Sequence, residues 1–239
     1  MTAAAAVQGN PLLAVRDVSV VFGGIVALNG VSFDMLKGQI LGLIGPNGAG
    51  KTTLFNCLSR LYQPSRGDIT MQGKSILTLP PHKICDIGIG RTFQNVALFP
   101  NMSVRDNIRV GAHSHTNGDI VSDSLHLPWT RRQERQTNSE VEEIIRYLDL
   151  GDVGDTLVSG LPFGTQKRVE LGRALAAEPK ILLLDEIVAG MNQEETEDVA
   201  RFILDIRDEL GIAIVLIEHD MRLVMDISDR VHVLNFGRT

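Results

Sequence analysis

Short apolar runs bounded by glycine or charged residues recur along the chain. Three of them, at Ile40 to Ile44, Ile181 to Asp185 and Ile212 to Ile217, have the length and composition of buried parallel strands. Each is followed by a segment with helical character. In the first, Lys51 to Leu61, apolar side chains share one helical face (Leu54, Phe55, Leu58 and Leu61). This alternation predicts an α/β fold.

The pattern changes between Arg91 and Gly172, where strand-like runs disappear. Ser139 to Leu150 is typical of an amphipathic helix, and Ser139 with Glu142 would form a capping box at its start. The stretch from Gly111 to Asn138 is polar and poorly periodic, so we expect an irregular excursion there. The side chains expected to face inward from the helix are Val141, Ile144, Ile145 and Leu148.

These patterns predict a single domain over residues 12–239. Its core comprises 12–90 and 173–239, a helical subdomain is inserted at 91–172, and residues 1–11 form a flexible N-terminal tail. With 239 residues and 44% hydrophobic content, the chain can bury a substantial core.

Composition excludes several classes of function. The longest apolar runs fall well short of the roughly 18 to 20 residues that a membrane-spanning helix needs. A formal charge of −6 argues against a broad nucleic-acid interface, although Arg131, Arg132 and Arg135 form one local basic cluster. The alanine-rich start does not resemble a secretory signal, so we expect Cys57 and Cys85 to be reduced thiols in the cytosol.

A glycine-rich sequence connects the first predicted strand to its helix, which is the context of a phosphate-binding P-loop. Glycines let backbone N–H groups converge on phosphate oxygens, and the helix N-terminus adds partial positive charge. Lys51 would contact the β- and γ-phosphates, and the Thr52 hydroxyl would ligate Mg²⁺. The expected ATP-binding residues here are Gly45, Pro46, Asn47, Gly48, Ala49, Gly50, Lys51, Thr52 and Thr53.

Charged side chains follow the other two predicted strands. Asp185 would hold Mg²⁺ through water, and Glu186 would act as the general base that polarises the attacking water. His219 ends the third strand, and we expect it at the same sheet edge, within reach of a γ-phosphate.

The sequence Leu161-Pro162-Phe163-Gly164-Thr165, shortly before the paired acids, resembles the signature sequence of the ABC ATPase family. The resemblance extends from about Leu12 to Arg238. It implies a P-loop NTPase (RecA-like) core with a mixed sheet and an inserted α-helical subdomain. It also implies that Phe22 stacks on adenine and that Gln94 senses Mg²⁺ and the γ-phosphate.

Resemblance further implies that two ATPase subunits pair head to tail, with each ATP between one P-loop and the partner's signature sequence. Gly164 would be the principal trans contact. A homodimer and a heterodimer with a sister ATPase both remain open.

Within the family, Phe22-Gly-Gly, Arg91-Thr-Phe-Gln and Ala189-Gly-Met-Asn192 resemble the ATPase of branched-chain amino acid importers. That subfamily implies integral membrane permease subunits as partners and, indirectly, a periplasmic or extracellular solute-binding protein. It implies a peripheral location on the cytoplasmic face of the inner membrane.

Five residues depart from the common family pattern. Pro162 replaces serine and so removes both a hydroxyl and a backbone N–H, and Phe163 and Thr165 replace the usual glycine and glutamine. Ile187 replaces proline, and Asn192 replaces the usual aspartate. We expect slower basal turnover rather than none.

Two alternatives remain at this stage. A soluble ABC ATPase of DNA repair, translation or cluster assembly would not be coupled to transport, but coiled-coil heptads and tandem domains are absent from the sequence. A nucleotide-binding switch without useful turnover is suggested by Pro162 and Ile187. Steady hydrolysis above a Lys51→Ala control would exclude it.

Overall fold

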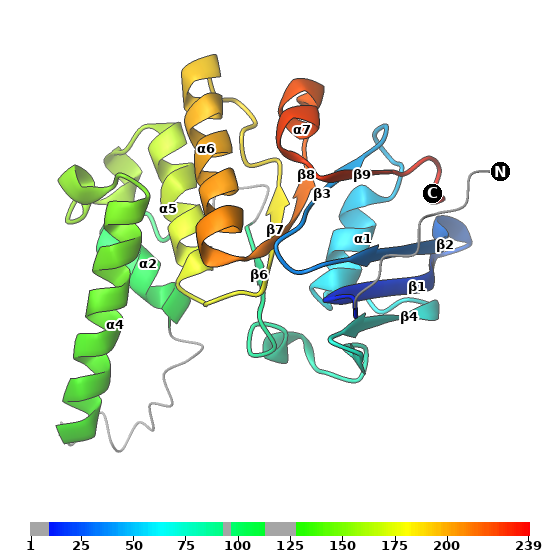
Figure 1. The fold of residues 1–239 in the computed structure, drawn as a ribbon, viewed down its shortest axis with the longest axis horizontal. Helices are drawn as coiled ribbons and strands as arrows, with labels where there is room; N and C mark the ends of the chain where they lie inside the picture. The colour runs from blue at the N-terminus through cyan, green and yellow to red at the C-terminus, as the bar shows by residue number, and fades with distance from the viewer. Residues whose placement is uncertain (1–9, 93–96, 113–127) are drawn as a thin grey trace.

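The computed structural model describes residues 10–92, 97–112 and 128–239, which form two β-sheets with helices between and beside them (Figure 1). The first sheet is antiparallel and four-stranded, in the order β2-β1-β4-β5. Its strands are β1 (Leu13–Phe22), β2 (Ile25–Met35), β4 (Arg66–Met71) and β5 (Lys74–Ser75).

The second sheet is parallel and five-stranded, in the order β6-β7-β8-β3-β9. The three apolar runs are its central strands, which confirms that part of the sequence analysis. The antiparallel and parallel strands thus belong to separate sheets. The strands are β3 (Ile40–Ile44), β6 (Ile89–Arg91), β7 (Ile181–Asp185), β8 (Ala213–Ile217) and β9 (Arg230–Val233).

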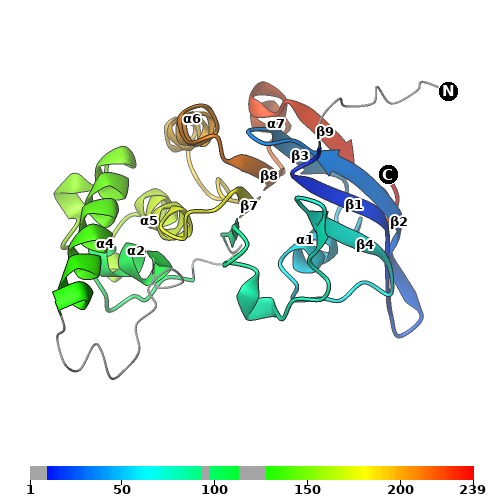
Figure 2. The same cartoon turned by 60° about the horizontal axis from the view of Figure 1, so that its bottom comes forward.

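Side chains alternate between the two faces of the parallel sheet, as the pleat requires. One face joins α1 (Lys51–Leu58) and the antiparallel sheet in a common apolar core. The other face packs under α6 (Gln193–Leu210) and α7 (Met221–Ile227). Figure 2 shows α1 between the two sheets. Leu41, Leu43, Leu183 and Val215 belong to the core that includes α1, whereas Ile40, Leu182, Leu184 and Leu216 belong to the core that includes α6 and α7.

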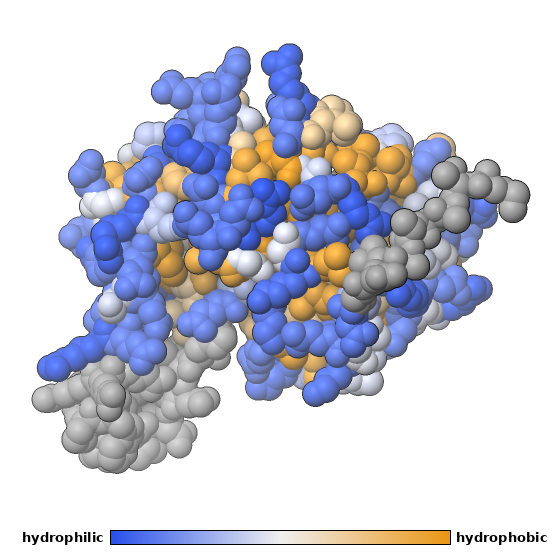
Figure 3. All heavy atoms as spheres, in the orientation of Figure 1, coloured by the Kyte–Doolittle hydropathy of each residue, from blue (hydrophilic) through white to orange (hydrophobic). Residues whose placement is uncertain are grey.

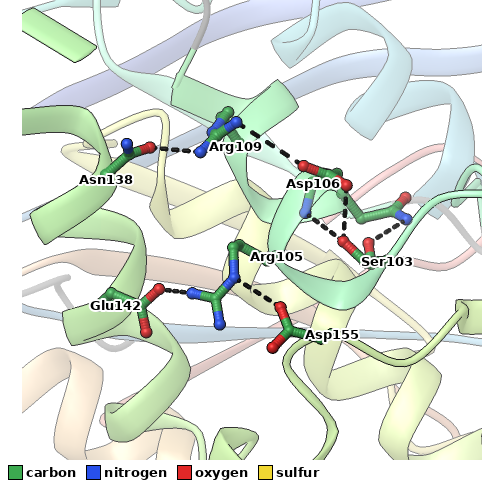
Figure 4. A network of polar contacts seen from close by, with 8 residues as sticks. Ser103, Arg105, Asp106, Arg109, Asn138, Glu142 and Asp155 are labelled. Atoms are coloured by element: carbon green, nitrogen blue, oxygen red, sulfur yellow. Dashed lines mark hydrogen bonds and ion pairs between the residues drawn. The ribbon is translucent and has the colours of Figure 1, made fainter. Parts of the chain in front are cut away.

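Three helices lie to one side of the sheets: α2 (Val104–Ala112), α4 (Pro128–Tyr147) and α5 (Phe163–Leu175). Arg105 of α2 forms ion pairs with Glu142 of α4 and with Asp155, and Arg109 of α2 donates to Asn138 of α4 (Figure 4). These contacts tie α4 to α2. Short 3₁₀ turns complete the chain at Pro81–Lys83, Gly151–Val153 and Val158–Gly160.

The predicted start of the long helix was wrong. Helix α4 begins at Pro128, so Ser139 and Glu142 lie inside it and form no capping box there. Residues 128–138 are helical rather than irregular, because arginine, glutamine and glutamate favour helix without an apolar face, and proline suits a first helical position. The inward face is confirmed, since Val141, Ile145 and Leu148 are buried.

The predicted end of the first helix was also too late. Helix α1 ends at Leu58, and Leu61 is 56% exposed. Arg60, with φ at 59°, breaks the helical backbone between them.

In the parts of the chain that the structure describes, no helix has both the length and the apolar character needed to cross a membrane. On the face seen in Figure 3, projecting hydrophilic residues alternate with smaller hydrophobic areas.

Candidate functional site

The glycine-rich turn joins β3 to α1 in the way its sequence predicts. Gly45 has φ at 152° and Gly50 at 104°. A Cβ at Gly45 would lie 2.1 Å from the carbonyl oxygen of Leu234, and one at Gly50 would lie 2.7 Å from that of Ala27. Both positions therefore require glycine, because the turn is pressed against neighbouring backbone.

Lys51 is folded into this turn and is only 7% exposed. Its Nζ donates to the carbonyl oxygens of Gly45, at 2.6 Å, and Pro46, at 3.2 Å. Thr52 and Thr53 follow in the first turn of α1, and Thr52 is exposed. The turn thus holds a cation beside the N-terminus of a helix, an arrangement that attracts phosphate.

Asp185 lies at the end of β7 and is 2% exposed. Its Oδ2 accepts from an Nη of Arg91 at 3.0 Å. Burial raises the pKa of the Asp185 carboxyl above its ordinary value, and the Arg91 guanidinium opposes that shift. The buried carboxyl is thus paired with a guanidinium at the end of the sheet.

Glu186 and His219 lie together at the carboxyl ends of β7 and β8. The Nε2 atom of His219 is 3.0 Å from Oε1 of Glu186, and the backbone N–H of Glu186 donates to Ile217 across the strand ends. Glu186 has φ at 52°, an unfavourable backbone conformation for a residue with a side chain. Such strain, held in place by neighbours, is typical of functional sites.

Two residues at this edge were not among the predicted site residues. Arg91 connects Asp185 to α1, and the buried Glu218 accepts from the backbone N–H of Val188 at 3.0 Å, which fixes the segment after Glu186. Burial raises the pKa of the Glu218 carboxyl. The available signal for Glu218 was a charged residue directly after an apolar run, but it did not identify a partner, and the three residues of β6 gave little signal for Arg91.

The signature segment, Leu161–Thr165, lies apart from the glycine-rich turn. Figures 1 and 2 show α5 and α1 on opposite sides of β7. Pro162 is the N-cap of α5, and a Cβ at Gly164 would lie 2.6 Å from Oε1 of Glu195. The segment therefore packs on the start of α6 in its own chain.

Phe22 ends β1 at a turn and is 44% exposed. Its ring meets that of Tyr62 edge-on, with centroids 5.1 Å apart. Gln94 lies outside the described residues.

Comparison with known proteins places this geometry in a family. A family profile described as "ABC transporter" matches residues 28–189, which is more than half of the chain. The chain belongs to the ABC transporter family. This membership confirms the expected P-loop fold and an ATP-binding, ATP-hydrolysing transporter subunit, and it does not favour the soluble alternative.

Among curated ABC proteins, the chain is 41% identical to the high-affinity branched-chain amino acid transport ATP-binding protein BraF of Pseudomonas aeruginosa, over 96% of this chain and 90% of that protein. It is 39% identical to the corresponding LivG of Escherichia coli K12 over the same shares.

Solved structures agree on the fold. A nucleotide-free ATP-binding cassette of an ABC transporter superposes with a TM-score of 0.82 at 28% identity, covering 95% of this chain and 89% of that one. Another cassette, in its ADP conformation, gives a TM-score of 0.83 at 29% identity over the same shares.

Proposed function

We propose that this chain hydrolyses Mg-ATP to drive import of branched-chain amino acids or related solutes through separate membrane permeases. The solute class is supported by 39–41% identity to BraF and LivG, which are named for branched-chain amino acid transport. Hydrolysis is supported most directly by the hydrogen bond between Glu186 and His219 beside the P-loop strand.

ATP would lie along the turn from Gly45 to Thr53, with its phosphates on the backbone N–H groups and Lys51. The site suits Mg²⁺, because this cation prefers hard oxygen ligands and is commonly held by one or two carboxylates together with substrate phosphates. Asp185, Thr52 and Gln94 would hold it. Phe22 would stack on adenine, and its exposed ring leaves a face for the base.

The cation would neutralise charge on the phosphates. Glu186 would take a proton from the attacking water, and His219 would orient the Glu186 carboxylate and contact the γ-phosphate. In this arrangement residues 91–172 are the helical subdomain, and residues 12–90 with 173–239 are the catalytic core.

The signature segment would serve a second ATPase subunit, either another copy or a sister chain. The pair would sit on the cytoplasmic face of the membrane against the permeases, with a solute-binding protein on the other side.

The substitution Glu186→Gln tests hydrolysis. It keeps the side-chain shape but removes the basic carboxylate, so we expect steady ATP turnover to fall by about a hundredfold or more while ATP binding persists. Glu178→Gln is a matched control, because Glu178 is exposed and also has positive φ, at 45°. Wild-type turnover in Glu186→Gln would refute the assignment of the base.

Coupling to transport needs a separate measurement. Gentle solubilisation of native membranes and mass spectrometry of proteins that co-purify with the tagged subunit should find polytopic permeases and a second ATPase. Recovery with soluble companions alone, and absence from membranes, would contradict the transport proposal.

A further inference from the structure

Arg91 makes polar contacts with two elements of the proposed ATP site. It is the last residue of β6, and its side chain is 11% exposed. One Nη donates to Oδ2 of Asp185 at 3.0 Å. The other donates to Oδ1 of Asn56 at 2.8 Å and to Oγ of Ser59 at 2.9 Å, while the guanidinium lies 5.7 Å from the centre of the Phe55 ring. The side chain therefore bridges β7 and α1.

The bridge reaches a particular face of α1. Asn56 and Ser59 follow Thr52 by four and seven residues, so the three positions lie along one side of the helix. Arg91 thus holds the helix face that carries the Thr52 hydroxyl. Through the same guanidinium it contacts Oδ2 of the Asp185 carboxylate.

A general stabilising role does not account well for this arrangement. Burying an ion pair costs desolvation that the attraction barely offsets, so such pairs contribute little net stability. A rigid guanidinium with several directed N–H donors instead fixes the relative positions of the groups that it contacts, because each hydrogen bond constrains the others. Here the guanidinium connects α1, which carries Thr52, to β7, which ends at Asp185.

We propose that Arg91 is a positioning residue for the divalent cation, setting the spacing between the Thr52 hydroxyl and the Asp185 carboxylate. This inference rests on the proposed function, in which those two groups hold Mg²⁺. In this arrangement Arg91 itself would contact neither the cation nor the nucleotide. Its effect should therefore appear in the affinity for the cation and leave metal-free nucleotide binding largely unchanged.

The test is binding of a fluorescent ADP analogue to the full chain, measured in EDTA and over a series of Mg²⁺ concentrations. Arg91→Met keeps the bulk of the side chain and removes its charge. We expect a rise of about tenfold or more in the Mg²⁺ concentration that gives half of the Mg²⁺-dependent change in analogue binding, as for other residues that orient metal ligands. In EDTA, affinity should change less than about twofold on the same reasoning.

Two further variants separate positioning from folding. Arg91→Lys keeps a cation but loses the fork of donors, so it should fold and give an intermediate shift. Arg66→Met is a matched control, because Arg66 pairs with Asp17 in an exposed ion pair and should leave the Mg²⁺ dependence unchanged.

An unchanged Mg²⁺ midpoint in folded Arg91→Met, or in Arg91→Lys if the first variant does not fold, would overturn the inference. So would an equal loss of affinity in EDTA and in Mg²⁺, which indicates a purely structural role. Failure of the wild-type chain to bind the analogue in either condition would instead overturn the proposed function.

Discussion

At the scale of single residues, the two cysteines differ in their access to solvent. Both are free thiols, but Cys57 lies within α1 with no exposed surface, and Cys85 is partly exposed. Burial raises the pKa of the Cys57 thiol to about 12. Burial and the neighbouring Asp86 also raise the pKa of Cys85.

A raised thiol pKa lowers the thiolate fraction at a given pH, and the thiolate is the reactive form. At about pH 8, roughly one Cys57 in ten thousand would be ionised. We expect an aromatic disulfide reagent to modify Cys85 slowly in the native protein and Cys57 only after denaturation.

The variant Cys85→Ser supplies the control, because it leaves Cys57 as the single thiol. Native Cys85→Ser should show no fast reaction, and guanidinium should release one reactive thiol. Rapid modification of the native variant would show that α1 opens readily, contrary to its packing.

The residues of the proposed ATP site could be suggested from the sequence. Lys51, Asp185, Glu186 and His219 each lie at or beyond the end of a recognisable strand, and parallel strands bring their carboxyl ends to one edge. The structure adds the Glu186–His219 hydrogen bond and the positive φ of Glu186. Arg91 and Glu218 could not be assigned from sequence, because their partners lie 94 and 30 residues away along the chain.

At the scale of elements, the sequence pattern predicted most clearly the strands that lie buried in the core. The strands β3, β7 and β8 are buried on both faces, so their sequences are continuous apolar runs. Strand β6 is only three residues long and gives little pattern to detect. The first half of α4 lacks an apolar face, and sequence periodicity therefore placed its start eleven residues too late.

The contact between the signature segment and α6 yields a prediction about coupled elements. Glu195 completes the capping box of α6, where Oε2 accepts from the Asn192 N–H at 3.0 Å and its own N–H donates to Asn192 at 2.9 Å. Because a Cβ at Gly164 would displace the Glu195 carboxylate, Gly164→Ala should weaken this cap. Alanine is also more favourable than glycine within a helix by about 1 kcal/mol, and this gain opposes the loss of capping energy.

The two effects separate in a double-mutant cycle followed by urea unfolding. In the Glu195→Ala background the clash is gone, so Gly164→Ala should be more favourable there than in wild type by about 1 kcal/mol, the usual value of a cap. Gly151→Ala is the control, since nothing lies within 4 Å of a Cβ at that position. Additive effects for Gly164 and Glu195 would show that the contact carries no energy.

At the scale of the whole molecule, the signature segment and the P-loop lie in different parts of the subunit. They lie on α5 and α1, which Figures 1 and 2 place on opposite sides of β7. In the proposed function, the ATP that the signature segment contacts would therefore be that of a second subunit. ATP binding should then control association, and Glu186→Gln should retain the ATP that holds two subunits together.

Pro162 offers a test of that association. It is the N-cap of α5, with φ at −55° and ψ at 151° and without a side-chain capping bond. Serine adopts the same backbone conformation, caps helices, and would add a hydroxyl and an N–H directed toward the partner's phosphate. Alanine would add the N–H alone.

In the Glu186→Gln background with ATP, we expect the dimer fraction to increase from Pro162 to Pro162→Ala to Pro162→Ser, measured by light scattering during gel filtration. With ADP all three proteins should remain monomeric, because the γ-phosphate is missing. Each charge-assisted hydrogen bond gained is worth about 1.5 to 3 kcal/mol, so tighter association by about tenfold or more is expected for the serine variant. If serine and proline gave equal dimer fractions, position 162 would not approach the partner's phosphate, and the trans contact would depend on Gly164 and its neighbours in α5.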